Sequence, residues 1–301
     1  MAEIVYPFQS IARRPRFVWP NGARVAVIVT VALECWELLP KAGSYSGGPT
    51  IMPIPLPAGV PDYPNYTWRE YGQRIGMWRI FDLLDSHGLK ASAPINTRFG
   101  SFYPEVLEAA RSRGWEFVAH SRLQHDLLSN FANDRAAEAA FLDSVVAEYK
   151  SVFGEAPRGW ISPSFSQSPN TLALLAERGF RWFCDFGNDD QPYKIEVEGR
   201  SILCIPQDME MPDSSLVLRR NFTSPEYAAT LEETFSVLHE EGRHQGRIMN
   251  LIIHPHVLGR ADKIRSVDRV LKFIKNKGDV WFPMREEIAD WFEGKDAFPA
   301  K

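Results

Sequence analysis

The sequence lacks several features that would assign it to a well-known class of protein. Cysteine is scarce: Cys35, Cys184 and Cys204 form no CxxC pair, and each lies in or beside an apolar run. This pattern favours buried free thiols over disulfides. Basic runs are also absent, with 34 Lys and Arg residues against 38 Asp and Glu residues. We therefore expect no nucleic-acid partner.

Long hydrophobic runs are missing as well. The longest, from Val25 to Trp36, is too short to span a bilayer and is interrupted by Thr30 and Glu34. No basic segment followed by an apolar stretch opens the chain, so no secretory signal is indicated. We therefore expect a cytoplasmic protein without membrane contact. GxGxxG, GxxxxGK and GxSxG motifs do not occur, which disfavours nucleotide cofactors and a Ser-His-Asp hydrolase.

Alternating strands and helices are the main pattern that the sequence does contain. Residues 24–32 are almost all apolar and β-branched, as expected for a strand buried on both faces of a parallel sheet. A helix follows from Thr67, which can cap it together with Glu70 three residues later, and Gly88 ends it. We expect further strands at 91–95, 116–119, 159–161, 182–184, 202–205, 247–253 and 280–282, and helices at 104–113, 134–153, 169–178, 225–241, 262–276 and 285–292.

This alternation predicts one domain over residues 1–301, because no break in composition divides the chain. Its parallel sheet is either doubly wound or closed as a (β/α) barrel, and we favour the barrel. Two segments lie outside the pattern. Residues 1–22 form an N-terminal extension, and the Pro/Gly-rich loop at 43–66 is long enough to shape or cover a pocket.

Polar residues fall next to the ends of successive predicted strands. Glu34 follows the first strand, His120 and His125 the third, and His254 the seventh. In a parallel barrel the carboxyl ends of the strands converge on one mouth, where catalytic groups collect. We expect the other polar residues near strand ends to join them: Asn96, Arg158, Ser162, Asp185, Asp190, Gln207, Glu210 and His256.

The residues with most metal-binding character are Glu34, His120 and His125. A carboxylate with two imidazoles is a common catalytic zinc set that leaves one position for water. Gln124 stands four residues after His120, where a second histidine would be easier to interpret. The residues alone leave open whether Gln124 or His125 faces the site. A hydrogen-bonded structural role for His120 is the alternative.

His254 is the candidate general acid, because a pKa near neutrality suits proton donation to a leaving nitrogen. Pro255 biases its backbone towards extended geometry; a histidine in a surface turn is the alternative. The candidate substrate-binding residues are Arg158, Ser162, Asp185, Asp190, Trp36 and Glu210. Ion pairing, turn formation and core packing would also account for several of these residues.

Taken in order, these motifs resemble the polysaccharide deacetylase superfamily, and within it the allantoinase-like and cyclic-imidase-like branch. The matching pieces extend over most of the chain: Val31 to Trp36, Trp68 to Gly72, Glu116 to His125, Arg158 to Pro163, Asp185 to Tyr193 and His254 to Arg260. The resemblance implies a distorted (β/α)7 barrel. It also implies hydrolysis of an amide-type C–N bond by a metal-activated or positioned water, with Glu34 and His254 as partners in proton transfer.

The chain departs from the superfamily's sugar deacetylases in two motifs. Those enzymes carry two adjacent aspartates and a His-x-x-x-His pair, whereas this chain has Glu34-Cys35 and Gln124. An N-acetyl-sugar substrate is thereby disfavoured. We hypothesise a hydrolase of a small amide, cyclic imide or ureide, with Glu34, His120 and either His125 or Gln124 holding a divalent metal, expected to be zinc, or the attacking water.

Two alternative functions stay open at this point. One is an N-deacetylase of an acetylated sugar or amine, and the other is a catalytically inactive barrel that binds a ligand. For the favoured hypothesis, the expected partners are a small-molecule substrate and further copies of the chain in a homo-oligomer.

Overall fold

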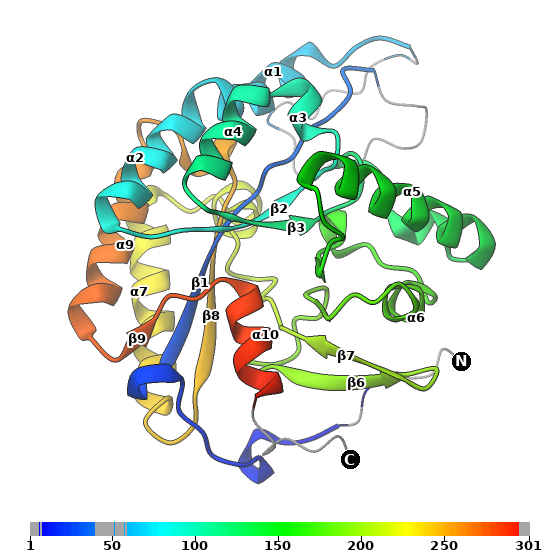
Figure 1. The fold of residues 1–301 in the computed structure, drawn as a ribbon. Coiled ribbons are helices and arrows are strands. Elements are labelled where there is room, and N and C mark those ends of the chain that lie inside the picture. Colours follow the sequence, from blue (N-terminus) through cyan, green and yellow to red (C-terminus); the bar gives the residue numbers. More distant parts are fainter. Residues whose placement is uncertain (1–5, 7, 40–50, 52–56, 58, 295–301) are drawn as a thin grey trace.

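A mixed sheet of nine strands organises the part of the chain that the structure describes, a computed structural model of residues 6, 8–39, 51, 57 and 59–294. The strand order is β6-β7-β5-β4-β3-β2-β1-β8, with β9 also paired to β1 (Figure 1). The strands are β1 (Val25–Val31), β2 (Ser92–Ile95), β3 (Glu116–Ala119), β4 (Gly159–Trp160), β5 (Trp182–Phe183), β6 (Tyr193–Val197), β7 (Arg200–Cys204), β8 (Arg247–Ile253) and β9 (Val280–Trp281).

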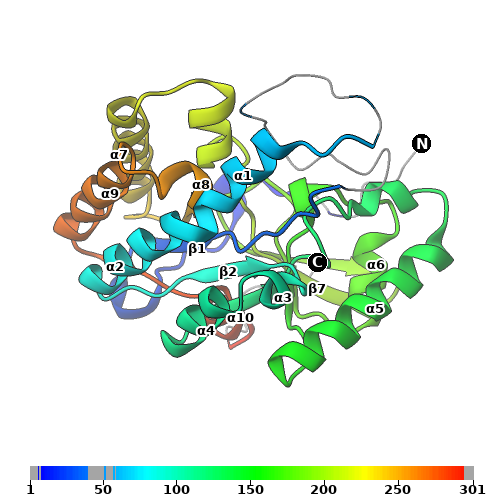
Figure 2. The ribbon, with the colours of Figure 1, turned by 90° about the horizontal axis from the view of Figure 1, so that it is seen from above.

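Helices surround these strands when the molecule is seen from above (Figure 2). The α-helices are α1 (Tyr63–Tyr71), α2 (Met77–His87), α3 (Phe99–Phe102), α4 (Pro104–Ser112), α5 (Arg135–Phe153), α6 (Thr171–Glu177), α7 (Ser224–Glu241), α8 (Pro255–Leu258), α9 (Ile264–Lys277) and α10 (Arg285–Glu293). Short helical turns are η1 (Ile11–Arg13), η2 (Pro20–Gly22), η4 (Leu128–Phe131) and η5 (Pro163–Phe165), and π-helical segments are η3 (Gly72–Gly76) and η6 (Ser214–Arg219).

The predicted α/β architecture is confirmed. Apart from the antiparallel pair β6·β7, all strand pairings are parallel, and β1 pairs with β8 from Val25↔Arg247 to Val31↔Ile253. In the described residues no ladder joins β7 to β8, so a seam separates the two ends of the parallel array. Polar bonds cross it: Asn250 Nδ2 donates to the carbonyl of Pro206 over 3.1 Å. The main-chain N–H of Ile248 donates to the carbonyl of Asp190 over 2.8 Å.

Side chains of β1 alternate between two environments, because successive residues of a strand point to opposite faces. Val25, Val27 and Val29 belong to the large core shared with the helices. Ala26 and Ile28 belong to a second core that includes residues from the other strands and from α10. Continuing this second face, Thr30, Ala32 and Glu34 line a cavity. This second face of β1 and of the residues that follow it is therefore apolar at its start and polar towards Glu34.

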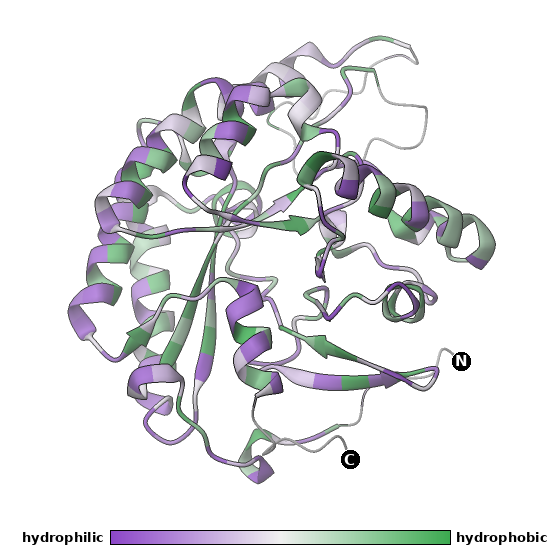
Figure 3. Ribbon diagram, in the orientation of Figure 1, coloured by the Kyte–Doolittle hydropathy of each residue, from purple (hydrophilic) through white to green (hydrophobic). Residues whose placement is uncertain are grey.

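The surrounding helices carry both hydrophilic and hydrophobic residues, as Figure 3 shows for α2, α7 and α9. Their apolar faces cover the strands. No helix among the described residues is long and apolar enough to cross a bilayer. Cys35, Cys184 and Cys204 are buried free thiols, as predicted.

Two local features differ from the sequence prediction. Helix α1 begins at Tyr63, because Asp62 caps it by accepting the N–H of Asn65 over 3.1 Å. The end of the predicted 43–66 loop is therefore helical, whereas its residues 43–50, 52–56 and 58 lie outside the described residues. Strand β6, which is not among the predicted strands, forms a hairpin with β7 across a turn in which Glu198 and Gly199 both have positive φ.

Candidate active site

A cavity of about 390 Å³ opens where the strands end. That volume suits a small molecule. Three of the residues expected to act in catalysis, Glu34, His120 and His254, line it together. The other lining residues are Thr30, Ala32, Pro94, Gln124, Ile161, Ser162, Ser164, Phe165, Gln207, Met209, Pro212, Ser214, Ser215, Arg219, Ile252 and His256.

Glu34 lies between two imidazoles. Its Oε1 is 3.8 Å from His120 Nε2 and 3.7 Å from His254 Nε2. Burial by itself raises the pKa of this carboxyl, but the charge of His254, the neighbouring His120 and the charge of Arg69 outweigh it and hold the pKa below its ordinary value. Glu34 is therefore an anion at neutral pH.

His254 is fixed by Asp213, the residue that precedes η6. Asp213 Oδ2 accepts the main-chain N–H of His254 over 2.7 Å, and Oδ1 faces Nδ1 at 2.5 Å. Burial lowers the pKa of His254, but the carboxylates of Asp213 and Glu34 raise it to a net value of about 9. The ring is therefore protonated at neutral pH and points Nε2 towards Glu34.

His120 is held in one tautomer by the backbone. Its Nδ1 lies 2.6 Å from the carbonyl oxygen of Ile161, which can only accept, so Nδ1 carries the proton. In the neutral ring Nε2 then has a free lone pair. This buried nitrogen has no hydrogen-bond partner among the described residues, and it faces Glu34.

Of the two residues considered as the third metal ligand beside Glu34 and His120, only Gln124 lies at the cavity. His125 does not line the cavity, and its Nε2 instead faces Glu37 Oε2 at 3.6 Å. Gln124 does line it, with a buried Oε1 that has no partner in the described part of the chain. No group of three His, Cys, Asp or Glu side chains among the described residues is arranged to hold a metal ion. These donors do not fit the three-ligand zinc site expected from the sequence.

Ser162 lines the cavity, and Asp185 supports it from behind. Asp185 accepts the main-chain N–H of Ser162 over 2.7 Å and its hydroxyl over 2.6 Å. Trp160 Nε1 donates to the same hydroxyl oxygen over 2.9 Å. Burial raises the pKa of Asp185 to about 6, against the lowering effect of the Ser162 bonds. Asp185 therefore positions Ser162 and does not itself line the cavity.

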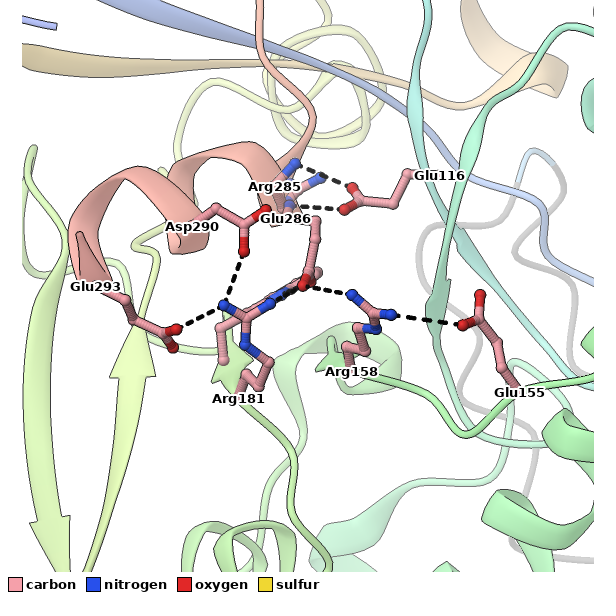
Figure 4. A network of polar contacts seen from close by, with 9 residues as sticks. Glu116, Glu155, Arg158, Arg181, Arg285, Glu286, Asp290 and Glu293 are labelled. Carbon is pink, nitrogen blue, oxygen red and sulfur yellow. Dashed lines mark hydrogen bonds and ion pairs between the residues drawn. The ribbon is translucent and has the colours of Figure 1, made fainter. Parts of the chain in front are cut away.

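Besides Asp185, four further predicted substrate-binding residues do not line the cavity. Arg158 precedes β4, so it lies at the opposite end of the strands, paired with Glu286 and Glu155 (Figure 4). Asp190 lies beside Arg247, where β8 begins. Glu210 is exposed and paired with Arg220. Trp36 is buried under the guanidinium of Arg69, whose Cζ is 5.0 Å from the ring centre.

The sequence interpretation passed over residues that shape the site. Asp213 is one of these residues. It follows β7, and a position after a strand was the reason for selecting Gln207 and Glu210. Arg69 is another: it lies in the quoted Trp68 to Gly72 motif, and its charge acts on Glu34. Thr30 was noted only as an interruption of the apolar run, yet a polar residue inside a buried strand indicates a polar interior.

Comparison with known proteins bears on the identity of this site. Residues 70–183 match the family model described as polysaccharide deacetylase. The resemblance to the polysaccharide deacetylase superfamily is confirmed. A Schizosaccharomyces pombe protein named "Putative polysaccharide deacetylase" is 25% identical over 307 residues, covering 94% of this chain and 94% of that protein. The matches agree with the expected enzyme class, a hydrolase of carbon–nitrogen bonds other than peptide bonds.

Solved structures share the fold of this chain over nearly its whole length. The crystal structure of PuuE allantoinase aligns with a TM-score of 0.86 and 23% identity, covering 98% of this chain and 100% of that chain. A "probable Polysaccharide deacetylase" from Pseudomonas aeruginosa aligns with a TM-score of 0.84 and 23% identity, over the same shares. These likenesses establish the fold.

Proposed function

We propose that this chain hydrolyses a non-peptide carbon–nitrogen bond in a small amide, cyclic imide or ureide. The observation that carries the proposal is the position of the Glu34 carboxylate between His120 and His254, with Asp213 behind His254. This arrangement provides an anionic base and a protonated acid in one cavity, the two groups that hydrolysis of such a bond needs.

The attacking water can bind between Glu34 and His120. Oε1 and Nε2 are both acceptors, and they lie 3.8 Å apart. A water at an ordinary hydrogen-bond length of about 2.8 Å from each can donate one proton to each acceptor. Its oxygen lone pairs are then free to face a carbonyl carbon. The donors present do not supply a three-ligand zinc site, so no step is assigned to a metal ion.

Two proton transfers complete the reaction. Glu34 takes a proton from the water as the oxygen forms its bond to the carbonyl carbon. The carbon–nitrogen bond then breaks, its electron pair goes to nitrogen, and His254 Nε2 supplies the proton that nitrogen needs to leave. Proton exchange with solvent restores both groups.

A panel of hydantoin, cyclic imides, allantoin and linear amides tests the proposal. We expect turnover by the wild type, and a loss of about 10² to 10⁴ in rate for His254→Ala, the range for removing a general acid. Glu34→Gln, which keeps the size of the side chain, should lose at least as much. Equal activity in wild type and His254→Ala would eliminate the assigned role.

The alternative functions give different results in the same assays. An N-deacetylase would release acetate from acetylated sugars or amines and leave the cyclic compounds intact. A ligand-binding barrel would turn over neither group. We further propose a homo-oligomer, which light scattering on the purified protein tests.

A further inference from the structure

Arg285, the first residue of α10, reaches between the strands from the end opposite the cavity mouth, next to the network drawn in Figure 4. It is fully buried. Its Nη2 donates to Thr30 Oγ1 over 2.9 Å, to Gln207 Oε1 over 2.6 Å and to Asn250 Oδ1 over 3.3 Å. These acceptors come from β1, from the segment after β7 and from β8. One guanidinium is therefore hydrogen-bonded to residues on both sides of the seam between β7 and β8.

This contact determines which way the Gln207 amide faces. Arginine only donates hydrogen bonds, so Gln207 must turn its oxygen towards Arg285. Its Nε2 then faces away from the guanidinium, and no described residue accepts from it. Asn250 also turns its oxygen towards Arg285, because its Nδ2 donates to the carbonyl of Pro206. Since Gln207 lines the cavity, it offers a donor there and not an acceptor.

Thr30 provides a second donor beside Gln207. Its hydroxyl oxygen accepts from Arg285, which leaves the hydroxyl proton available, and Thr30 also lines the cavity. Thr30 and Gln207, which we call the cavity floor, therefore offer two donors oriented by a single buried cation.

The charge of Arg285 acts on the buried carboxyl of Glu116, but no carboxylate among the described residues forms an ion pair with its guanidinium. Its three side-chain acceptors are neutral, and Nε and Nη1 are buried without hydrogen-bond partners among the described residues. Glu116, the nearby carboxylate, accepts the main-chain N–H of Arg285 over 3.0 Å and does not bond the guanidinium. Burying an unpaired charge is unfavourable, so an anion bound above Thr30 and Gln207 would be stabilised.

The floor lies far from the reacting groups. Thr30 precedes Glu34 by four residues, which in extended backbone separates the two Cα atoms by about 13 Å at ~3.3 Å per residue. A group bound at the floor therefore belongs to the end of the substrate that is remote from the bond being cleaved.

We propose that Thr30 and Gln207, oriented by Arg285, form a subsite for a carboxylate at the remote end of the substrate. This inference rests on the proposed function and narrows its substrate class to small amides, imides or ureides that carry a carboxylate. Thr30 and Gln207 contact the substrate, and Arg285 is a positioning residue.

Matched substrates test the subsite. Each of succinamate, glutaramate and adipamate is compared with the corresponding neutral diamide. We expect kcat/KM of the wild type to favour at least one carboxylate over its diamide by about tenfold or more, mainly through KM. Gln207→Leu should remove most of this preference, and Gln207→Glu, which places an anion at the floor, should reverse it.

Two further variants separate the subsite from general stability. Gln191→Leu removes a buried glutamine that bonds the carbonyl of Gly246 and does not line the cavity, so the preference ratio should not change. Arg285→Lys keeps the charge but cannot hold three acceptors in the same geometry, and the ratio should fall. Retention of the full preference in Gln207→Leu and Arg285→Lys would overturn the inference.

Binding to Glu34→Gln makes the test independent of turnover. Calorimetry should show tighter binding of the preferred carboxylate than of its diamide in this variant, and loss of the difference when Gln207→Leu is added. If the wild type hydrolyses carboxylates and diamides equally, the subsite is wrong and the proposed function stands. If nothing is hydrolysed but the binding preference is present, the proposed function fails and the subsite stands.

Discussion

Asp213 holds His254 at two points, with one carboxylate oxygen on its main-chain N–H at 2.7 Å and the other facing Nδ1 at 2.5 Å. The first contact fixes where the residue lies, and the second fixes which way its ring faces. Both come from a residue 41 positions earlier in the chain. The direction of Nε2 therefore depends on η6 as well as on the strand that carries His254.

Asp213→Asn tests the electrostatic part of this contact. The amide can still accept the main-chain N–H, but the negative charge is lost, so the pKa of His254 should fall from about 9 towards its ordinary value. We expect the fall of kcat/KM at alkaline pH to begin at lower pH, with a loss of about tenfold or more at pH 8. The measurement is kcat/KM from pH 5 to 10. An alkaline limb that does not move would show that His254 is not the acid.

The stability of the fold should depend on the same proton. The pKa of His254 is raised from 6.5 to about 9 in the folded protein, so the folded state binds this proton more tightly than the unfolded state. The resulting stabilisation is fully present below pH 6.5 and is lost as the pH rises through 9, by up to about 3 kcal/mol. Denaturant unfolding of wild type and His254→Gln at pH 6 and pH 9.5 measures it. A stability difference between the two proteins that is the same at both pH values contradicts the expectation.

Gly76→Ala tests how closely η3 packs against the segment that follows His254. A Cβ at Gly76 would lie 2.2 Å from the carbonyl oxygen of Pro255. Alanine normally favours a helix over glycine, but this contact forces the backbone to move, and we expect a loss of about 1 to 3 kcal/mol together with reduced activity. Gly294→Ala is the matched control, because its nearest contact is an ordinary 3.4 Å. The measurement is the free energy of unfolding of each variant, and equal values for the two would contradict the packing argument.

Metal content tests the interpretation of the donor set. Gln124 faces the cavity and His125 faces Glu37, so we expect less than one zinc ion per chain in protein purified without chelator. Gln124→His adds an imidazole beside Glu34 and His120 and should raise the zinc content towards one. His125→Gln, the control, should not change it. Elemental analysis by mass spectrometry measures all three proteins, and stoichiometric zinc in the wild type that is lost in His125→Gln would reverse our assignment.

Much of the fold could be predicted from local patterns. Strand β1 is a run of residues that are all buried, and helix α5 carries both its end signals, Asp134 at the start and Gly154 at the end. The β6·β7 hairpin could not, because Glu198-Gly199 is not one of the usual hairpin turn pairs. The polar residues of this hairpin are also typical of a loop.

The topology explains why part of the site could be predicted from the sequence. Residues that follow parallel strands share one end of the sheet, and Glu34, His120 and His254 do meet there. Arg158 stands before its strand, so the same rule places it at the other end. The contact between Asp213 and His254 joins two segments that no local pattern connects, and the orientation of Gln207 depends on a guanidinium from a distant helix.

Because the guanidinium that orients the cavity floor comes from helix α10, part of the site's selectivity is set from the opposite surface of the molecule. A change in how that outer helix sits would alter what the pocket accepts while leaving its reactive groups in place. Adaptation to new substrates can therefore begin far from the entrance, at positions that a search confined to the mouth would overlook.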